Sequence, residues 1–578
     1  MKDKFMRKVR GDLLTRKTKG NIFLPAKSLV VSGAAILCMA LGAEPACANG
    51  SYVRSVCCLA LASSTIYHEG WTDFNKNGLK DVYEDRAQPV EVRVADLVGR
   101  MTVEEKTCQL ATLYGSYRVL GDAEPTAEWK NEIWKDGIAN IDEELNGVGK
   151  CYKKAYDRIF PFSNHARALN RIQRWFVEET RLGIPVDFSN EGVHGLNHTK
   201  ATPLPAPIGI GCTWNRKLVR RAGEIVGLEA KLLGYSNVYA PILDVARDPR
   251  WGRVLECYGE DPHLVAELGR EMVEGIQSQG VASTVKHFAA YSVPKGGRDA
   301  DCRTDPHIAP RELHEIFLHP FRRVVREAHP LGVMCSYNDW NGEPVVASGY
   351  FLTDLLRGEY GFGGYVVSDS GAVEFVHTKH AVAETYAEAV RQVLEAGLNV
   401  RTHFTHPKDF VLPVRQLVAE GRLSTETLDR RVADVLSVKF RLGLFDQPYV
   451  ADPDEADRQV GADKNEAFVD ELQDESLVLL KNAGVFLPLD ATKVRKVVVV
   501  GPLAEATGYT VSRYGPNGLA AVSVADGIRA TLAGRAEVVC CKGCDVVNDG
   551  WPETEAVPGP LTAAERSGIT ADWFYAEN

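Results

Sequence analysis

The chain repeats one pattern through its N-terminal two thirds: a short apolar run ends in a polar cluster, and a helical stretch leads to the next run. Six such runs lie at residues 184–188, 238–243, 281–285, 332–335, 365–368 and 398–400. Their spacing of about 30 to 55 residues is typical of β/α units, which place consecutive strands in a parallel sheet. The pattern therefore predicts an α/β fold.

The polar cluster after each run distinguishes between the two common parallel architectures. A closed (β/α)8 barrel gathers the carboxyl ends of all its strands around one site. An open doubly wound sheet uses a single crevice and, for dinucleotides, a G-x-G-x-x-G turn after an early strand; no such turn follows the first strands here. The clusters therefore favour a TIM-like (β/α)8 barrel over residues 92–405, and a dinucleotide enzyme is not expected.

The rest of the chain is expected to form a further unit. Residues 406–470 are interpreted as a linker. A helical segment at 475–482 and strand-like runs at 497–500 and 536–540 then indicate a second α/β unit. Two strands and a helix or two cannot bury both faces of a sheet. Residues 471–578 are therefore predicted to form an incomplete second α/β sandwich domain.

The first 48 residues differ in composition from the rest of the chain. They contain nine Lys or Arg against three acids, then an apolar run at 29–41 and the tripeptide Ala46-Cys47-Ala48. This order is typical of a secretory signal peptide with an A-x-A cleavage site, and the run is short for a membrane span. We predict that residues 1–48 are removed and that the protein is exported to the periplasm or outside the cell, without a membrane anchor.

Net charge bears on the possible partners, and cysteine content bears on the possible disulfides. The formal charge is −10, with no long basic run beyond the N-terminus, which argues against a nucleic-acid partner. Export would permit disulfides among the thirteen cysteines, but their spacing does not define the pairs.

One motif between the signal and the barrel, within residues 49–91, has a metal-binding pattern. Residues 73–84 read DFNKNGLKDVYE, which fits the calcium-loop pattern D-x-[DN]-x-[DN]-G-x5-E. The oxygen ligands would be Asp73, Asn75, Asn77, Asp81 and Glu84. The motif predicts a structural Ca²⁺ ion, and the alternative is a polar turn that holds no ion. No cofactor is expected for the chemistry itself.

The run at 365–368 ends at a carboxylate, Asp369, which Ser370 and Gly371 follow. A carboxylate at the tip of an apolar strand is costly to hold unless it is paired or solvated. In a parallel barrel, that tip is also where chemistry is usually done. We therefore hypothesise that Asp369 is a nucleophile. The alternative is that Asp369 caps the next helix.

Five ordered stretches at successive strand ends carry a family resemblance. They are NEGVHG (190–195), APILDVARDPRWGRVLECYGEDP (240–262), VKHFAAYS (285–292), GVMCSYNDWNG (332–342) and GYVVSDSGAV (364–373). Together they resemble glycoside hydrolase family 3, the exo-acting β-glucosidases and β-xylosidases. In addition, LLKNAGVFLPL (479–489) resembles the start of that family's second domain.

The resemblance implies roles for single residues. Asp369 matches the family nucleophile, which attacks the anomeric carbon of the sugar. The substrate-binding positions of the family match Glu191, Arg253, Lys286, His287 and Tyr337. The acid grips the distal hydroxyls, the three basic residues bind the sugar, and the tyrosine lies beside the nucleophile. A retaining glycosidase also needs a protonated carboxyl group about 5–5.5 Å from the nucleophile.

Some of these positions have structural alternatives. His287 could be a core histidine whose hydrogen bonds are satisfied. Arg253 could form a rim pair with Asp244, although Arg250 fits that pairing better. Lys286 is hard to explain as a core residue, because a buried lysine needs acidic partners.

Two features depart from the family pattern. Glu191 and Ser370 stand where many of the β-glucosidases have Asp and Trp, and here the sequence is closer to the xylosidase branch. A longer acid leaves less room for a hydroxymethyl group, so a pentose is favoured. No residue matches the glutamate that the second domain supplies as acid/base in most of the family. The histidine used by the N-acetylglucosaminidase branch is also absent after KHF, and we assign no general acid.

The sequence thus predicts an exported, exo-acting retaining β-glycosidase. It would hydrolyse terminal β-linked glucose or xylose from oligosaccharides through a glycosyl-enzyme intermediate on Asp369. The second hypothesis is a truncated, catalytically weak sugar-binding protein. General acid catalysis contributes roughly 10²–10⁴ in rate, so a protein that lacks the acid/base residue would be slow.

Overall fold

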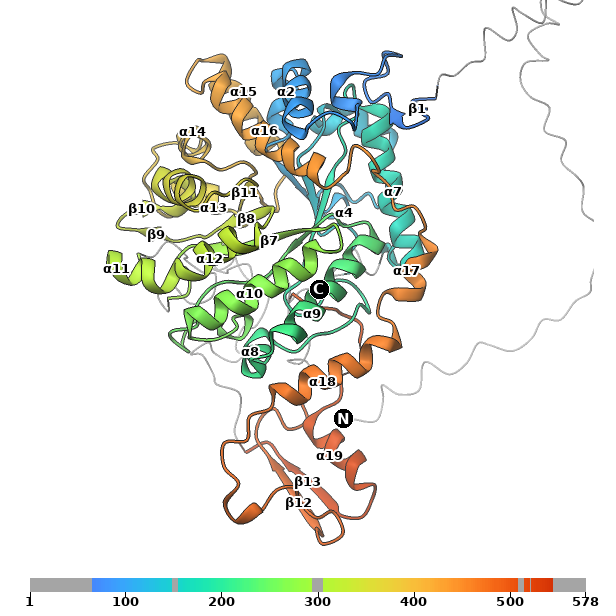
Figure 1. The fold of residues 1–578 in the computed structure, drawn as a ribbon, viewed down its shortest axis with the longest axis vertical. Coiled ribbons are helices and arrows are strands. Elements are labelled where there is room, and N and C mark those ends of the chain that lie inside the picture. Colours follow the sequence, from blue (N-terminus) through green and yellow to red (C-terminus); the bar gives the residue numbers. More distant parts are fainter. Residues whose placement is uncertain (1–64, 148–153, 294–304, 508–513, 520, 544–578) are drawn as a thin grey trace, which may run out of the picture. The chain divides into compact units, whose positions relative to one another are not determined.

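The computed structural model describes residues 65–147, 154–293, 305–507, 514–519 and 521–543 (Figure 1). The predicted signal peptide, residues 1–48, lies outside the described residues. Residues from Thr65 onward group as one compact unit.

A parallel sheet forms the centre of the fold. Its seven strands are β3 (Thr112–Tyr114), β4 (Asn140–Asp142), β5 (Asp187–Glu191), β6 (Asn237–Tyr239), β7 (Ala282–Phe288), β8 (Gly332–Cys335) and β11 (Tyr365–Ser368). Each strand pairs in parallel with the next. Parallel bridges join Val400 to Val367 of β11 and Arg401 to Ala111 beside β3. The segment at 398–401 therefore links the two edges of the sheet, and the barrel prediction is confirmed.

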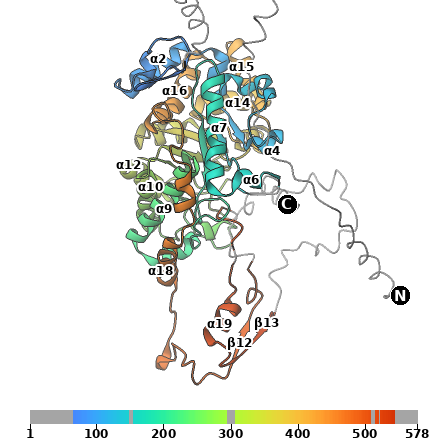
Figure 2. The same cartoon turned by 90° about the vertical axis from the view of Figure 1, so that its right-hand side faces the viewer.

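The helices α9 (Arg216–Leu233), α10 (Pro262–Gln277) and α12 (His319–Ala328) lie side by side on the outside of the sheet (Figure 1). The α9–α10 contact is close because glycines face each other across it. A Cβ on Gly223 would lie 2.7 Å from the Met272 carbonyl oxygen, and one on Gly275 would lie 2.4 Å from the Arg220 carbonyl oxygen. Helix α7 (Phe162–Glu179) packs against α9 on its other side (Figure 2).

Polar side chains fill part of the barrel interior and hydrogen-bond to one another. The Asn140 side chain donates to the Tyr239 hydroxyl at 2.9 Å and to Ser189 Oγ at 3.0 Å. The Tyr365 hydroxyl donates to Asp187 Oδ2 at 2.8 Å. Because these bonds join different strands and satisfy buried groups, they fix the strands relative to one another.

Helices begin where the sequence supplies a cap. Thr102 Oγ1 accepts from the Glu105 N–H at 3.3 Å, and Glu105 Oε2 accepts from the Thr102 N–H at 2.9 Å. This capping box separates α2 (Val90–Arg100) from α3 (Val103–Cys108), because the residue at a cap leaves the helical conformation.

The other elements before β8 are short, apart from α8. They are β1 (Tyr67–His68), β2 (Trp71–Thr72), η2 (Val82–Glu84), α4 (Ser116–Leu120), η3 (Ala127–Asn131), η4 (Ile133–Asp136), α6 (Tyr156–Ile159), α8 (Pro207–Thr213), η5 (Val254–Glu256), α11 (Pro310–Glu312) and η6 (Leu313–Phe317).

The elements that follow β8 in the chain, apart from β11, extend to the helix α16. They are β9 (Asp339–Trp340), β10 (Glu343–Pro344), η7 (Val345–Ala347), η8 (Tyr350–Glu359), α13 (Ala372–Thr378), α14 (Tyr386–Ala396), α15 (Lys408–Ala419) and α16 (Thr425–Arg441). Helix α16 lies in the segment interpreted as a linker, and it packs against α2 and β11.

The C-terminal elements are α17 (Asp454–Gln459), η9 (Asp463–Asn465), α18 (Glu466–Ser476), η10 (Ala483–Val485), β12 (Lys496–Val500), α19 (Val524–Leu532) and β13 (Glu537–Cys541). The parallel pair β12–β13 confirms both predicted strands. The predicted helix at 475–482 is wrong, because Leu477 is extended and Leu480 is 92% exposed. These apolar residues find no buried face that would stabilise a helix. The domain boundaries stay a prediction.

None of the helices in the described ranges has the length and apolar character needed to cross a bilayer. The cysteines of the same ranges form no disulfide.

Candidate active site

A buried ion pair lies at the carboxyl ends of two barrel strands. Lys286 Nζ, on β7, donates to Glu191 Oε1 at 2.7 Å and Oε2 at 2.5 Å, at the end of β5. Only 1% of the lysine side chain is exposed. Burial raises the pKa of Glu191 to about 7, and the nearby Lys286 opposes this rise. The acidic partner expected for a buried Lys286 is therefore Glu191.

Arg253 follows β6 in the chain and is also buried. Its guanidinium binds Glu256, with Nη2–Oε2 at 2.7 Å and Nε–Oε2 at 3.1 Å. The rim pair between Arg253 and Asp244 does not form as a hydrogen bond, and Arg250 pairs with Asp248 instead. Glu256 lies three residues after Arg253 on the same short turn, so its carboxylate is close enough to bind the guanidinium in place of Asp244.

His287 lies between two carboxylates. Its Nδ1 is 2.7 Å from Asp244 Oδ2, and its Nε2 is 3.6 Å from Asp369 Oδ2. The imidazole is 1% exposed. Nδ1 is satisfied within the core, as the core-histidine alternative expects, and Nε2 faces the predicted nucleophile.

Asp369 stands directly after β11, with the residue 9% exposed. Its Oδ1 accepts the Ser370 N–H at 2.7 Å. Its Oδ2 is buried and accepts no hydrogen bond from the described residues. The helix-cap alternative is wrong, because α13 has Gly371 as its N-cap residue and no side chain caps it.

Aromatic side chains surround this group. The Tyr291 ring lies 5.3 Å from the His287 ring and 5.7 Å from the Tyr337 ring, centroid to centroid. Tyr337 is buried beside Asp369, and burial together with the Asp369 charge raises the pKa of its hydroxyl well above the usual value. The Trp251 ring stands 5.4 Å from Tyr291. Glu191 and Lys286 thus meet at the ends of β5 and β7, and His287 and Tyr337 lie beside Asp369. Arg253 Cζ lies 5.8 Å from the centroid of the Tyr291 ring.

Tyr514, from the segment at 514–519, was missed by sequence analysis. Its ring centroid lies 4.9 Å from Lys286 Nζ and 5.5 Å from Arg253 Cζ. Its carbonyl oxygen accepts the His194 N–H at 3.2 Å, which holds this segment to the loop after β5. The sequence signal was an aromatic residue before a Gly-Pro-Asn-Gly turn.

Two further acids next to Glu191 were also missed. Asp142 ends β4, and burial raises its pKa well above the usual value, with the charges of Glu143 and Glu191 adding to the rise. Burial opposes ionisation of Glu143, but Arg118 at 2.7 Å lowers its pKa below the usual value. The signal was a polar cluster, Asp142-Glu143-Glu144, after a run too short to recognise as a strand.

The predicted calcium loop at 73–84 is compact and closed by its own hydrogen bonds. Glu84 Oε1 accepts the Phe74 N–H at 2.8 Å, and its Oε2 accepts the Asp81 N–H at 2.9 Å. The side-chain amides of Asn75 and Asn77 both lie within 2.7 Å of Asp81 Oδ2. Across the described ranges, no group of three or more His, Cys, Asp or Glu is arranged to hold a metal ion. The calcium site stays a prediction, which would need the two asparagine oxygens.

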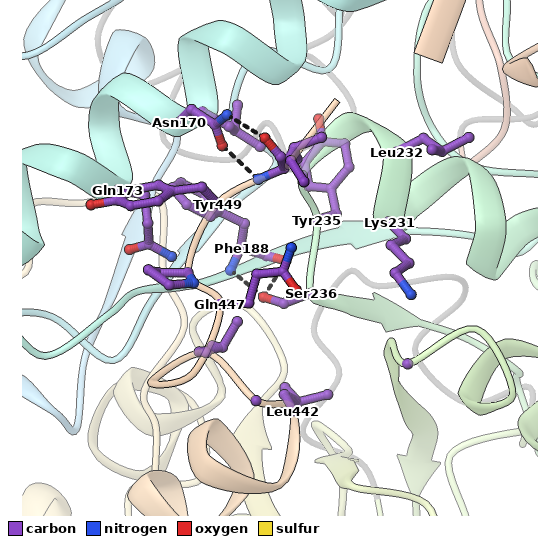
Figure 3. A pocket seen from close by; sticks show the side chains of 18 of the residues that line it. Asn170, Gln173, Phe188, Lys231, Leu232, Tyr235, Ser236, Leu442, Gln447 and Tyr449 are labelled. Atoms are coloured by element: carbon purple, nitrogen blue, oxygen red, sulfur yellow. Dashed lines mark hydrogen bonds between the residues drawn. The ribbon is translucent and has the colours of Figure 1, made fainter. Parts of the chain in front are cut away.

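A separate cavity of about 520 Å³ lies at the amino ends of β5, β6 and β7, away from Asp369 (Figure 3). Its polar groups bind one another. Asn170 makes two hydrogen bonds to the Val450 backbone, at 2.9 and 2.8 Å. Ser236 Oγ accepts the Phe188 N–H at 2.8 Å. Among the described residues, no charged side chain that lines this cavity has a buried atom without a hydrogen-bond partner. The cavity is therefore not the candidate site.

Comparisons with known proteins agree with this geometry. The model of the glycosyl hydrolase family 3 N-terminal domain matches residues 102–438. A β-xylosidase of Formosa agariphila is 33% identical over 67% of this chain and 56% of its own length. A periplasmic β-glucosidase of Salmonella typhimurium is 31% identical over 79% of this chain and 56% of its own length. The chain thus spans about half the length of the curated relatives it matches.

Solved structures show the same similarity. A β-glucosidase of Erythrobacter marinus superposes with a TM-score of 0.72 at 32% identity, over 81% of this chain and 60% of the other. A β-glucosidase of Listeria innocua in complex with glucose gives a TM-score of 0.66 at 29% identity, over 79% and 61%. Because the family model covers more than half of the chain, and the barrel and its rim agree with it, this chain belongs to glycoside hydrolase family 3.

Proposed function

We propose that this chain is an exo-acting retaining β-glycosidase that removes terminal β-linked xylose or glucose from oligosaccharides, with Asp369 as nucleophile. One observation carries the proposal. Asp369 Oδ2 is buried without a hydrogen-bond partner among the described residues and lies 3.6 Å from His287 Nε2. A buried carboxylate oxygen without a partner is costly. A bond to the anomeric carbon of the sugar would give this oxygen a partner.

The surrounding charges suit a sugar. Lys286 with Glu191, and Arg253 with Glu256, are buried ion pairs whose side chains can donate to hydroxyls and accept from them. Charge-assisted hydrogen bonds of this kind are stronger than neutral ones. They would hold the terminal sugar and leave its anomeric carbon at Asp369.

The reaction proceeds in two steps. Asp369 Oδ2 forms a bond to the anomeric carbon while the bond from that carbon to the leaving oxygen breaks, and the leaving oxygen keeps the electron pair. Water then attacks the same carbon, the bond to Asp369 breaks, and the water's proton passes to solvent. An activated aryl leaving group departs as its anion, so this chain needs no general acid for that substrate.

The decisive experiment is covalent trapping. The protein is incubated with 2,4-dinitrophenyl 2-deoxy-2-fluoro-β-xyloside, which forms the glycosyl-enzyme quickly and releases it slowly. Peptide mass spectrometry should find the added sugar on Asp369, and Asp369→Ala should abolish both the adduct and dinitrophenolate release. Asp354→Ala, which changes an exposed acid, serves as the matched control. An adduct on another residue, or undiminished turnover in Asp369→Ala, would overturn the proposal.

Glu191 supports xylose over glucose as the terminal sugar. Its carboxylate is fixed by Lys286 at 2.5 Å, and its extra methylene, compared with Asp, occupies space that a hydroxymethyl group would need. We expect a higher kcat/KM for the aryl β-xyloside than for the aryl β-glucoside. Glu191→Asp should narrow that ratio. An unchanged ratio in Glu191→Asp would remove the specificity argument and leave the glycosidase assignment intact.

A weak, sugar-binding protein is the second candidate function. Its support is that no residue of the chain is assigned as general acid, a contribution of roughly 10²–10⁴ in rate. The natural disaccharide separates the two functions, because its leaving group requires a proton. Turnover of xylobiose as well as of the dinitrophenyl glycoside supports the enzyme. Xylobiose binding in calorimetry with turnover of neither substrate supports the binding protein.

Export to the periplasm or the extracellular space is part of the proposal. Its support is the Ala46-Cys47-Ala48 sequence after an apolar run and two relatives whose names call them periplasmic. Fractionation of expressing cells, with N-terminal sequencing of the exported protein, should find a new N-terminus at residue 49. Retention of residues 1–48 on protein in the cytoplasm would contradict export.

A further inference from the structure

Asp244 is held beside β7 by the backbone. The loop that leaves β6 runs parallel to β7, with a bridge between Ile242 and Lys286 and a hydrogen bond of 2.6 Å from the Leu243 N–H to the Lys286 carbonyl oxygen. This register places Asp244 opposite His287, the next residue of β7. Asp244 therefore reaches the imidazole without any adjustment of the barrel.

Asp244 contacts His287 twice. Its Oδ2 accepts the His287 backbone N–H at 3.2 Å and lies 2.7 Å from the ring Nδ1. Both side chains are 1% exposed, so water does not compete for these bonds. A carboxylate and an imidazole nitrogen at this distance share a proton, and the shared proton fixes both the tilt of the ring and the direction of Nε2.

The direction of Nε2 matters because it faces Asp369 Oδ2 at 3.6 Å. A neutral ring with its proton on Nδ1 would turn the Nε2 lone pair toward a carboxylate, which is repulsive. A ring that carries protons on both nitrogens lies favourably between two carboxylates. The arrangement Asp244–His287–Asp369 thus fits an imidazolium between two carboxylates.

We propose that Asp244 is a positioning residue of the glycosidase: it anchors His287 so that a proton on Nε2 faces Asp369 Oδ2 and keeps the nucleophile ionised for attack. This inference rests on the proposed function. It gives Asp244 a role that neither the sequence motifs nor the pairing with Arg253 suggested.

Other ionisable groups lie around Asp244, His287 and Asp369 and affect their charges. They are Arg253 and Glu256 from the loop after β6, Tyr291 from the loop after β7, and Cys335 and Tyr337 from the end of β8. Arg253 forms an ion pair with Glu256, and His287 Nε2 lies 3.6 Å from Asp369 Oδ2. Burial raises the pKa of Asp244 to about 7, and Arg253 opposes this rise. Changes at Asp244 are therefore expected to alter the pH dependence of the reaction.

The first test measures the ring itself. Nitrogen-15 spectra of the histidine side chains are recorded against pH for the wild type, Asp244→Asn and Asp244→Ala, with His287→Gln used only to assign the signal. His287 should carry protons on both nitrogens to a higher pH in the wild type than in Asp244→Ala. Asp244→Asn, which keeps an oxygen acceptor but loses the charge, should fall between them. Identical titrations in all three proteins would overturn the proposal.

The second test measures the nucleophile through the rate of trapping by the dinitrophenyl 2-fluoroxyloside as a function of pH. Asp244→Ala should slow trapping by about 10²-fold, the loss typical of a misplaced reacting group, and should move the acid limb of the profile to higher pH. Asp244→Asn should recover part of the rate. Asp248→Asn, on the same loop but paired with Arg250, should behave as the wild type.

The outcomes separate this inference from the proposed function. Trapping of Asp369 with the same pH profile in the wild type and Asp244→Ala would overturn the role of Asp244 alone. No adduct on Asp369 in the wild type would overturn the proposed function and the role of Asp244 in catalysis together. The nitrogen spectra would then still decide whether Asp244 orients His287. Circular dichroism and thermal melts of the two Asp244 variants show that each is folded before its rate is compared.

Discussion

Lys286 of β7 and Glu191 of β5 meet across the intervening strand β6, with both carboxylate oxygens of Glu191 within 2.7 Å of Nζ. Lys286→Met would leave the carboxylate buried and unpaired. We expect a loss of about 3–5 kcal/mol in the free energy of unfolding, measured by urea denaturation. The loss should be larger at pH 8 than at pH 5, because a carboxyl whose pKa is raised by burial destabilises the folded state more as pH rises through that pKa.

The double variant Lys286→Met/Glu191→Gln is the control for this pair. It removes the buried charge, so part of the lost stability should return and the difference between pH 5 and pH 8 should shrink. If Lys286→Met were as stable as the wild type at both pH values, the pair would not stabilise the fold.

Lys439 predicts a second dependence of stability on pH. Its Nζ donates to Gln109 Oε1 at 2.8 Å and to the Ile138 carbonyl oxygen at 3.0 Å, and burial lowers its pKa to about 7. Since the unfolded chain binds this proton up to pH values near 10.5, the wild type should gain stability from this group as pH rises from 7 to 10. Lys439→Met should flatten that gain in urea melts, whereas Lys217→Met, at an exposed position, should not. Parallel pH curves for Lys439→Met and the wild type would contradict the assignment.

Gly371 makes the turn after Asp369 possible. Its φ is +84°, and a Cβ there would lie 3.1 Å from His403 Cδ2. Gly371→Ala should therefore cost about 1–2 kcal/mol for the backbone conformation, with a further loss because the His403 ring must move. Gly421→Ala is the matched control, because Gly421 has φ +68° and no atom within 4 Å of its Cβ position. Thermal melts that gave equal losses for the two variants would mean that the His403 contact is unimportant.

The calcium prediction for residues 73–84 is checked by thermal melts with and without Ca²⁺. We expect Ca²⁺ to raise Tm more than Mg²⁺ does, because a loop of carboxylate and amide oxygens suits the larger ion. Asp81→Asn should reduce the shift, since Asp81 receives both asparagine amides at 2.6 and 2.7 Å. If Ca²⁺ left Tm unchanged, the loop would be a polar turn closed by its own hydrogen bonds.

Several elements could be predicted from sequence because their signals are local. Strand β8 has the predicted bounds, and β11 ends at Ser368 before Asp369 as expected. The cap at Thr102 was recognisable because a capping box lies within four consecutive residues. The failed helix at 475–482 shows the limit of such signals, because a helix-like composition without a buried face does not stay helical.

The sequence by itself determined the parallel β/α order, the strand ends that bear polar groups and the identity of the nucleophile candidate. These follow from periodicity and from motifs within short stretches. Only the tertiary structure decided the partners: Glu191 for Lys286, Glu256 for Arg253, and Asp244 for His287. The physical reason is that barrel closure and strand register bring together residues far apart in the chain, and no local pattern encodes those distances. Glu191 and Lys286, for example, lie 95 positions apart.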